Sequence, residues 1–453
     1  MAKLVDALVS GSSAERHAGS IPVPGTKIYE GICRLWQIPF FVIEVSEVIE
    51  IIEITEVIEM ELATKIEKKY IHEHIDDDVR DLALRMKENE DFRPKFVLQQ
   101  IAGIQAMKRK MPQWAENEDI IYPVHLSLEQ CSSEFTTRPK SDIIWRYSDK
   151  ISEKNYADLT GGFGVDFSVM SAGFGRSYYV ERNNELCEIA AHNFNALKLR
   201  NYEIINGDGV EFLKNFDGHF GAVFIDPARR SKSGSKTVRI SDCEPDVVGF
   251  QDILLQKTDL IIIKLSPMLD ISECTSKLKN VAEIHVVGVD GECKELLAVM
   301  IPGFNEEPKI FVYDTDRYIH IFLRSDEANG YAKTATNLET GMYLYEPNAA
   351  IMKAAPFNLL AEYYFLEKIS DNSHLYVSKD LINVFPGRRF KIMKIGGVKD
   401  FKHIEKANIT VRNFPMKADE LRKKMKIKDG GDVYLFATTM ADGRKIMLET
   451  ARF

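Results

Sequence analysis

The chain has 453 residues and a formal net charge of −9, with 45% hydrophobic residues and no apolar run long enough to span a membrane. This composition fits several ordinary globular domains and excludes a membrane-embedded or fibrous protein. Six scattered cysteines without a Cys-x-x-Cys pair argue against a zinc site and a disulfide framework and favour a reducing cytoplasm; they are Cys33, Cys131, Cys187, Cys243, Cys274 and Cys293.

The first part of the chain is patterned differently from the rest. Residues 1–26 have no sustained helical or strand period, and they resemble a spurious translation across the opposite strand of a tRNA gene. Residues 43–50 (IEVSEVIE) recur nearly unchanged at 52–59 (IEITEVIE), but two copies are too few for a solenoid. A signal peptide is a poor alternative, because no cationic region leads into an apolar core. We expect residues 1–59 to be a non-native or disordered extension, with Met60 as the native start.

Residues 60–120 are charged and helical in pattern. Apolar side chains recur at helical spacing from Ile75 to Met86 and from Val97 to Met107. The segment predicts a small helical cap whose main role is helix packing.

Residues 158–166 (DLTGGFGVD) are the most informative stretch. A short strand ends at Asp158, three glycines follow, and a helical pattern resumes, which is the layout of a nucleotide-binding turn between a strand and a helix. Glu181 comes 19 residues after Gly162, at the end of the next strand, where ribose hydroxyls would lie.

Two cofactors compete for this turn. A dinucleotide fold needs a third glycine three residues after the second, but that position is Phe167. Asp158 and Asp166 are unsuited to a pyrophosphate, whereas carboxylates suit the ammonium group of a methionine moiety. The pattern favours S-adenosylmethionine over NAD. The alternative to both cofactors is a glycine-rich turn that binds no ligand.

Later strands end in similar polar loops. Asp208 and Gly209 follow the strand at 202–205, Asp226 follows 221–225, and Lys264 lies near the end of 260–265. Because ligands of parallel sheets sit at the carboxyl ends of the strands, these side chains should converge on one rim. The predicted cofactor-binding residues are Asp158, Thr160, Gly161, Gly162, Gly164, Asp166, Glu181, Arg182, Asp208, Gly209 and Asp226.

The loop after 221–225 carries the predicted chemistry. Methyl transfer requires alignment of nucleophile, methyl group and sulfur, and Asp226-Pro227 lies where the methyl group should point. A carboxylate there can accept a hydrogen bond from an amine. Arg229 could stack on a base or bind a phosphate. The alternative for Arg229 and Arg230 is an ion pair at the protein surface. The predicted catalytic residues are Asp226, Pro227 and Arg229; the methylated atom stays open.

Basic residues concentrate near the C-terminus. Residues 379–428 carry a net +10, whereas the remaining residues carry −19. Such a module is the electrostatic footprint of an anionic partner, although a solvated lysine face gives the same pattern. The predicted RNA-binding residues are Arg229, Arg230, Lys264, Arg388, Arg389, Arg412, Arg422, Lys423 and Lys424.

Over roughly residues 60–453 the chain resembles bacterial class I S-adenosylmethionine-dependent methyltransferases with a C-terminal THUMP-like domain. The resemblance rests on the motifs at 158–166, Glu181, Asp208, 226–230 (DPARR) and 264–268 (KLSPM), and on 412–415 and 430–438 in the tail. The resemblance implies an α/β protein with a Rossmann-like seven-stranded sheet and a methyltransferase acting on RNA, either tRNA or rRNA. The expected domains are a helical cap (60–120), a cofactor-binding domain (121–330), a ferredoxin-like α+β unit (335–390) and a basic THUMP-like domain (391–453).

Two other functions remain open at this stage. One is methylation of a small molecule or a protein, and the other is RNA binding without catalysis on a retained cofactor fold. The expected partner is RNA, with no membrane and no metal. The sequence does not fix the RNA species or the oligomeric state.

Overall fold

The structure is a computed structural model that describes residues 63–87, 92–124, 129, 131–229, 239–315 and 319–452. The chain divides into two units, Met1–Glu59 and Met60–Phe453. The predicted extension at 1–59 therefore lies outside the described residues, as does Arg230.

Short helices open the described part of the chain. Asp78 caps α4 by accepting from the N–H groups of Arg80 and Asp81, and a buried face of Val97, Ile101 and Met107 runs along α5 as its 3.6-residue period predicts. Their bounds are α3 Lys65–Glu73, α4 Val79–Arg85, α5 Pro94–Lys110 and α6 Pro112–Ala115.

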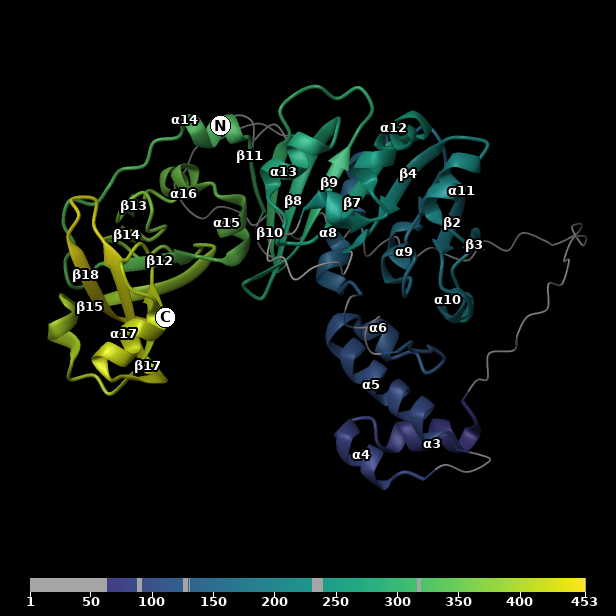
Figure 1. The fold of residues 1–453 in the computed structure, drawn as a ribbon, viewed down its shortest axis with the longest axis horizontal. Coiled ribbons are helices and arrows are strands. Elements are labelled where there is room, and N and C mark those ends of the chain that lie inside the picture. The colour runs from purple at the N-terminus through teal and green to yellow at the C-terminus, as the bar shows by residue number, and fades with distance from the viewer. Residues whose placement is uncertain are drawn as a thin grey trace, which may run out of the picture. The chain divides into compact units, whose positions relative to one another are not determined.

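A nine-stranded sheet forms the centre of the next part of the chain (Figure 1). Its order is β11-β10-β8-β9-β7-β4-β1-β2-β3, and β3, β2, β1, β4 and β7 run parallel. β9 runs antiparallel to β7 and to β8. It forms a hairpin with β8 through Asp290-Gly291, a dipeptide that is typical of hairpin turns. The strands are β1 Asn155–Asp158, β2 Arg176–Glu181, β3 Tyr202–Asn206, β4 Phe220–Ile225, β7 Thr258–Leu265, β8 Val281–Val289, β9 Glu292–Met300, β10 Lys309–Asp314 and β11 Ile319–Phe322.

The prediction of seven strands is therefore short by two. β10 adds to β8 in parallel, with Ile310 opposite Ile284, and β11 returns antiparallel to β10. Ile310 and Val312 are buried, so the added strands extend the core beyond the hairpin.

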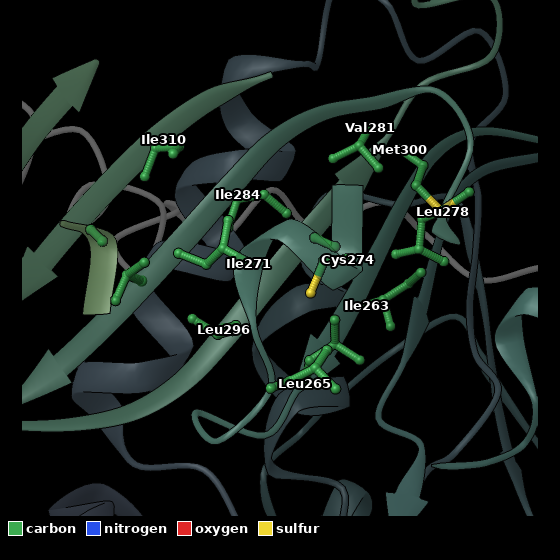
Figure 2. Packing of buried hydrophobic residues seen from close by; sticks show 14 of the residues in the cluster. Ile263, Leu265, Ile271, Cys274, Leu278, Val281, Ile284, Leu296, Met300 and Ile310 are labelled. Atoms are coloured by element: carbon green, nitrogen blue, oxygen red, sulfur yellow. The ribbon is translucent and has the colours of Figure 1, made fainter. Parts of the chain in front are cut away.

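Helices cover both faces of this sheet. Side chains of α8, α9 and α10, such as Ile143, Phe167 and Phe194, pack on one face. Those of α11, α12 and α13 pack on the other, and Figure 2 shows Ile271 and Cys274 of α13 among strand side chains. The helices are α8 Glu134–Arg146, α9 Val165–Met170, α10 Asn184–Ala196, α11 Gly209–Asn215, α12 Val247–Lys257 and α13 Ile271–Lys277, with a two-stranded pair β5 Ala228–Arg229 and β6 Cys243–Glu244 and a 3-10 turn η1 Ile240–Asp242.

The C-terminal part forms one continuous seven-stranded sheet, ordered β13-β14-β12-β15-β18-β17-β16. The sequence Ala441-Asp442-Gly443 is typical of a hairpin turn, and it connects the antiparallel strands β17 and β18. The elements are α14 Arg324–Asn329, β12 Tyr343–Pro347, α15 Ala349–Ala354, α16 Phe357–Tyr363, β13 Glu367–Lys368, β14 Tyr376–Ser378, β15 Gly387–Gly396, η2 Val398–Phe401, β16 Lys406–Val411, α17 Ala418–Met425, β17 Lys428–Thr439 and β18 Lys445–Arg452.

The sequence from Asn348 to Leu366 predicts a single helix, and this prediction is wrong. Two helices, α15 and α16, replace it, because Ala355 adopts a left-handed conformation at φ 61° and Pro356 cannot donate a helical hydrogen bond.

Candidate functional site

The glycine turn after β1 has the geometry that its sequence predicts. Gly162 and Gly164 have φ of 59° and 84°, which favours glycine at both. Gly161 is required for a different reason, because a Cβ there would lie 2.4 Å from the Tyr179 ring. The Thr160 N–H donates to Oδ1 of Asp158 at 2.9 Å, which closes the start of the turn.

Glu181, at the end of β2, is held by two backbone donors. Its Oε2 accepts from the Gly162 N–H at 2.9 Å, and its Oε1 accepts from the Asn183 N–H at 2.8 Å. The carboxylate is therefore fixed beside the glycine turn, in the position that the spacing predicts for ribose recognition.

Asp208 and Arg182 form an ion pair across the next two loops. Asp208 caps α11 through the N–H groups of Val210 and Glu211, both at 2.9 Å. Burial would raise the pKa of Asp208, but those hydrogen bonds and the Arg182 guanidinium hold it below its usual value. Arg182 also donates to Glu244 of β6 at 2.9 Å, so it links the loops after β2 and β3 to the segment that follows Asp226. Gly209 packs against Leu159, where a Cβ would lie 2.1 Å from the Leu159 carbonyl oxygen.

Asp226 is fixed from two sides. Its N–H donates to Thr160 Oγ1 at 2.7 Å, and its Oδ2 lies 2.6 Å from Lys264 Nζ of β7. Burial would lower the pKa of Lys264, but the carboxylates of Asp226, Asp166 and Glu295 raise it above its usual value, so the ammonium stays charged. Within the described part of the chain, no hydrogen bond reaches Asp226 Oδ1.

Asp158 and Asp166 have opposite electrostatic environments. Burial, with the nearby charges of Asp166 and Asp226, raises the pKa of Asp158 to about 8 against the hydrogen bonds from Thr160. Burial would also raise the pKa of Asp166, but Lys140 and Lys264 lower it. The rim therefore combines a carboxyl group that is protonated near neutral pH with one that is ionised.

Sequence reasoning missed a buried group beneath this rim. Lys140 of α8 is fully buried, and its Nζ lies 2.9 Å from Asp166 Oδ1, 2.9 Å from Ser132 Oγ and 3.0 Å from Glu295 Oε1. Ser132 in turn donates to Asp166 Oδ2 at 2.7 Å. The one available signal was Glu295, a carboxylate at the head of the apolar run of β9.

The structure brings the predicted cofactor residues together around the ends of β1, β2, β3 and β4. Pro227 follows Asp226 directly and is buried. Arg229 lies in β5, paired with Cys243, and its side chain is outside the described residues, so its predicted catalytic and RNA-binding roles remain predictions. Among the described residues, no group of three or more His, Cys, Asp or Glu side chains could hold a metal ion.

Three of the predicted RNA-binding arginines, Arg388, Arg389 and Arg412, have partners within the described part of the chain. Arg388 and Arg412 both donate to the buried carboxylate of Glu346, with Arg388 Nε at 2.8 Å and Arg412 Nη2 at 2.9 Å. Arg389 donates to the Asn383 carbonyl.

The helix α17 presents the remaining three predicted RNA-binding residues. Arg422 pairs with Asp419 at 2.6 Å and with Asp429 at 2.7 Å. Lys423 and Lys424 are exposed on the same helix.

The sheet order with one antiparallel strand inside it, and the glycine turn after β1, define the class I methyltransferase fold. A crystal structure described as a "putative methyltransferase from Porphyromonas gingivalis W83" matches with 31% identity and a TM-score of 0.71, over 85% of this chain and 97% of that one. This chain belongs to the same family. Family models identify a ferredoxin-like domain at residues 343–386 and a THUMP domain-like region at 387–452.

More distant structures match about a third of the chain. An rRNA methylase from Streptococcus thermophilus is 14% identical over 36% of this chain and 97% of that chain, with a TM-score of 0.28. A methyltransferase structure from Streptococcus mutans, in complex with SAH, is 11% identical over 36% and 96% of the two chains, also with a TM-score of 0.28. The comparison with curated proteins found no match. No helix in the described ranges is long and apolar enough to cross a bilayer.

Proposed function

We propose that this protein is an S-adenosylmethionine-dependent methyltransferase that modifies a nucleotide in tRNA or rRNA. The observation that carries the proposal is a pair of hydrogen bonds at the glycine turn: the Gly162 N–H donates to Glu181 Oε2, and the Asp226 N–H donates to Thr160 Oγ1. They hold the Glu181 carboxylate and the backbone of the loop that carries Asp226 against the same turn.

The residues of the turn fit the cofactor. Close approach of a ligand to the backbone is possible at Gly161, Gly162 and Gly164, where larger side chains are excluded by contact or by positive φ. Glu181 would accept from ribose hydroxyls, and Asp158 and Asp166 would face the methionine moiety. When bound, S-adenosylmethionine supplies the methyl group as an electrophile.

Asp226 has the geometry of an orienting group. Lys264 occupies Oδ2, which leaves Oδ1 able to accept one hydrogen bond from the methyl acceptor and so align its lone pair. An amine acceptor does not need to transfer a proton to Asp226 or Lys264, because orienting the amine requires only an oxygen that accepts its hydrogen bond.

RNA as substrate is supported by the basic THUMP-like region, with its net +10 over residues 379–428. A cytoplasmic location follows from that substrate and agrees with the unpaired state of the five cysteines in the described chain.

The test has two parts. Calorimetry should detect binding of S-adenosylhomocysteine and no binding of NAD, and tritium from labelled S-adenosylmethionine should appear in an RNA fraction. Nuclease treatment of the fraction should abolish the label; label that survives nuclease would point to the protein or small-molecule alternative. Cofactor binding without label in any fraction would favour a non-catalytic RNA-binding protein.

A further inference from the structure

A hollow of about 910 Å³ lies in the THUMP-like domain, outside the methyltransferase site. It is built by the loop between β16 and α17, together with the end of β17 and the start of β18. Its lining residues are Val411, Asn413, Phe414, Pro415, Met416, Lys417, Ala418, Glu420, Thr439 and Lys445.

The loop that forms the hollow is held rigidly. The Arg412 N–H donates to the Ala437 carbonyl at 3.0 Å, and Thr439 Oγ1 donates to the Asn413 carbonyl at 2.5 Å. The Asn413 amide donates to Ser370 Oγ at 3.3 Å, and Asn413 itself has a φ of 51°. A preformed concave surface of this size lies in the range of small-ligand sites.

The lining of the hollow has apolar side chains at its base and lysine side chains at its edge. Phe414 and Met416 are half-buried against the small core beneath α17, and Pro415 is exposed beside them. Lys417 and Lys445 are exposed at the rim, and in the described part of the chain neither ammonium group has an ion-pair partner. Glu420 is the single lining carboxylate, and it accepts from the Lys417 N–H at 3.0 Å.

An aromatic surface beside unpaired lysines is suited to a base and its phosphate. Arg388 and Arg412 share the Glu346 carboxylate and Arg422 pairs with Asp419 and Asp429, whereas the cations that line this hollow are lysines. A folded duplex keeps the ring faces of its bases stacked inside the helix, whereas an unpaired nucleotide presents a ring face that can lie on Phe414.

We propose that this hollow binds an unpaired nucleotide of the substrate RNA, with its base against Phe414 and Met416 and its phosphates near Lys417 and Lys445. The proposal rests on the proposed function and adds the class of RNA element that the THUMP-like domain recognises: a single-stranded segment. The methyltransferase site then acts on a different nucleotide of the same RNA.

The experiment measures the affinity of the full-length protein for a fluorescent oligouridylate and for a blunt RNA duplex of equal length. Phe414→Leu keeps an apolar side chain but removes the stacking surface, and it should weaken oligouridylate binding about tenfold with little effect on the duplex. Lys417→Glu with Lys445→Glu should weaken oligouridylate binding further and reduce its salt dependence.

Two further variants distinguish binding at the hollow from a general effect of charge. Lys399→Glu with Lys402→Glu makes the same total charge change in the same domain outside the lining, and it should affect both RNAs alike and weakly. Glu420→Gln keeps an acceptor for the Lys417 N–H but removes the lining carboxylate, so it should strengthen oligouridylate binding.

Thermal melting and S-adenosylhomocysteine binding should be unchanged in every variant, which excludes misfolding as the cause. Equal losses for both RNAs in Phe414→Leu, or no loss at all, would overturn the hollow as a nucleotide site while RNA methylation by the wild type upheld the proposed function. A wild type that neither binds nor methylates RNA would overturn both.

Discussion

Lys264 Nζ lies 2.6 Å from Oδ2 of Asp226, and the pair joins the ends of two neighbouring parallel strands, β7 and β4. The Lys264 side chain is 14% exposed, so it does not reach outward toward a bound RNA as a rim lysine would. Its position indicates that it orients the Asp226 carboxylate, which makes it a positioning residue for the proposed reaction. The sequence alone predicted an RNA contact for Lys264, and the geometry supports this other role.

Replacing Lys264 tests the role of the pair. Lys264→Met should lower kcat for methyl transfer about 100-fold, because Asp226 loses the partner that fixes its orientation. S-adenosylhomocysteine affinity should change little, since Lys264 binds the acceptor loop. Lys279→Met removes a similar but exposed ion pair, with Asp252, and should leave kcat unchanged. An equal loss of kcat in both variants would contradict a specific role for Lys264.

Glu181 should control cofactor affinity. Glu181→Ala should weaken S-adenosylhomocysteine binding by about 1–3 kcal/mol, because it removes an acceptor of the ribose hydroxyls and leaves the Gly162 N–H without its partner. Glu185→Ala, on an exposed turn of α10, is the matched control and should bind normally. Calorimetry measures both. Unchanged affinity in Glu181→Ala would place the ribose elsewhere.

Asp158 should make stability depend on pH. Its pKa is raised to about 8 by burial, so between pH 4 and 8 the folded chain holds a proton that the unfolded chain has lost. Stability from this group therefore falls as pH rises across that window, by roughly 1.4 kcal/mol per pH unit.

Asp158→Asn isolates that contribution. The amide oxygen can still accept from Thr160, and the variant has no proton to lose. The difference in free energy of unfolding between variant and wild type should grow in favour of the variant from pH 5 to pH 8. Parallel pH profiles from urea titration would show that Asp158 titrates normally.

The parts of the fold that could be predicted are those that depend on residues close together in the sequence. The strands that lead into Asp158, Glu181, Asp208 and Asp226 could be predicted because each gives way to a polar loop, and the continuous apolar runs of β4 and β7 are typical of parallel strands buried on both faces. The helix break at Pro356 could also have been predicted, since proline removes a hydrogen-bond donor.

The burial of Lys140 could not be predicted from the residues around it in the sequence. Lys140 lies in a helix rich in polar residues and has the appearance of a surface residue; its contact with Glu295 spans 155 positions of sequence. Only the packing of α8 over β9 removes it from water. The same reason explains the internal pairing of Arg388 and Arg412, whose shared partner Glu346 lies on β12.

Residues 1–59 should be dispensable, because their sequence shows no core pattern. A chain that begins at Met60 should melt at the same temperature as the full chain and bind S-adenosylhomocysteine equally well. Calorimetry of both chains measures this. A lower melting temperature or weaker binding in the shorter chain would show that the segment contributes to the fold.

The basic region should divide into arginines that stabilise the fold and lysines that bind RNA. Glu346→Gln leaves the half-buried guanidinium groups of Arg388 and Arg412 without their shared carboxylate, and it should lower stability by about 2 kcal/mol. Lys423→Glu with Lys424→Glu should leave the melting temperature unchanged, since both side chains are exposed.

The lysine pair should instead change RNA binding. Affinity should fall, and the slope of log affinity against log salt should flatten by about one per lysine, because fewer counterions are released. Arg422 is kept in this variant, since its pairs with Asp419 and Asp429 would be lost by a charge reversal and the fold would be disturbed. If the lysine reversal leaves both affinity and salt slope unchanged, this face of α17 is a solvated surface, and RNA must bind elsewhere on the domain.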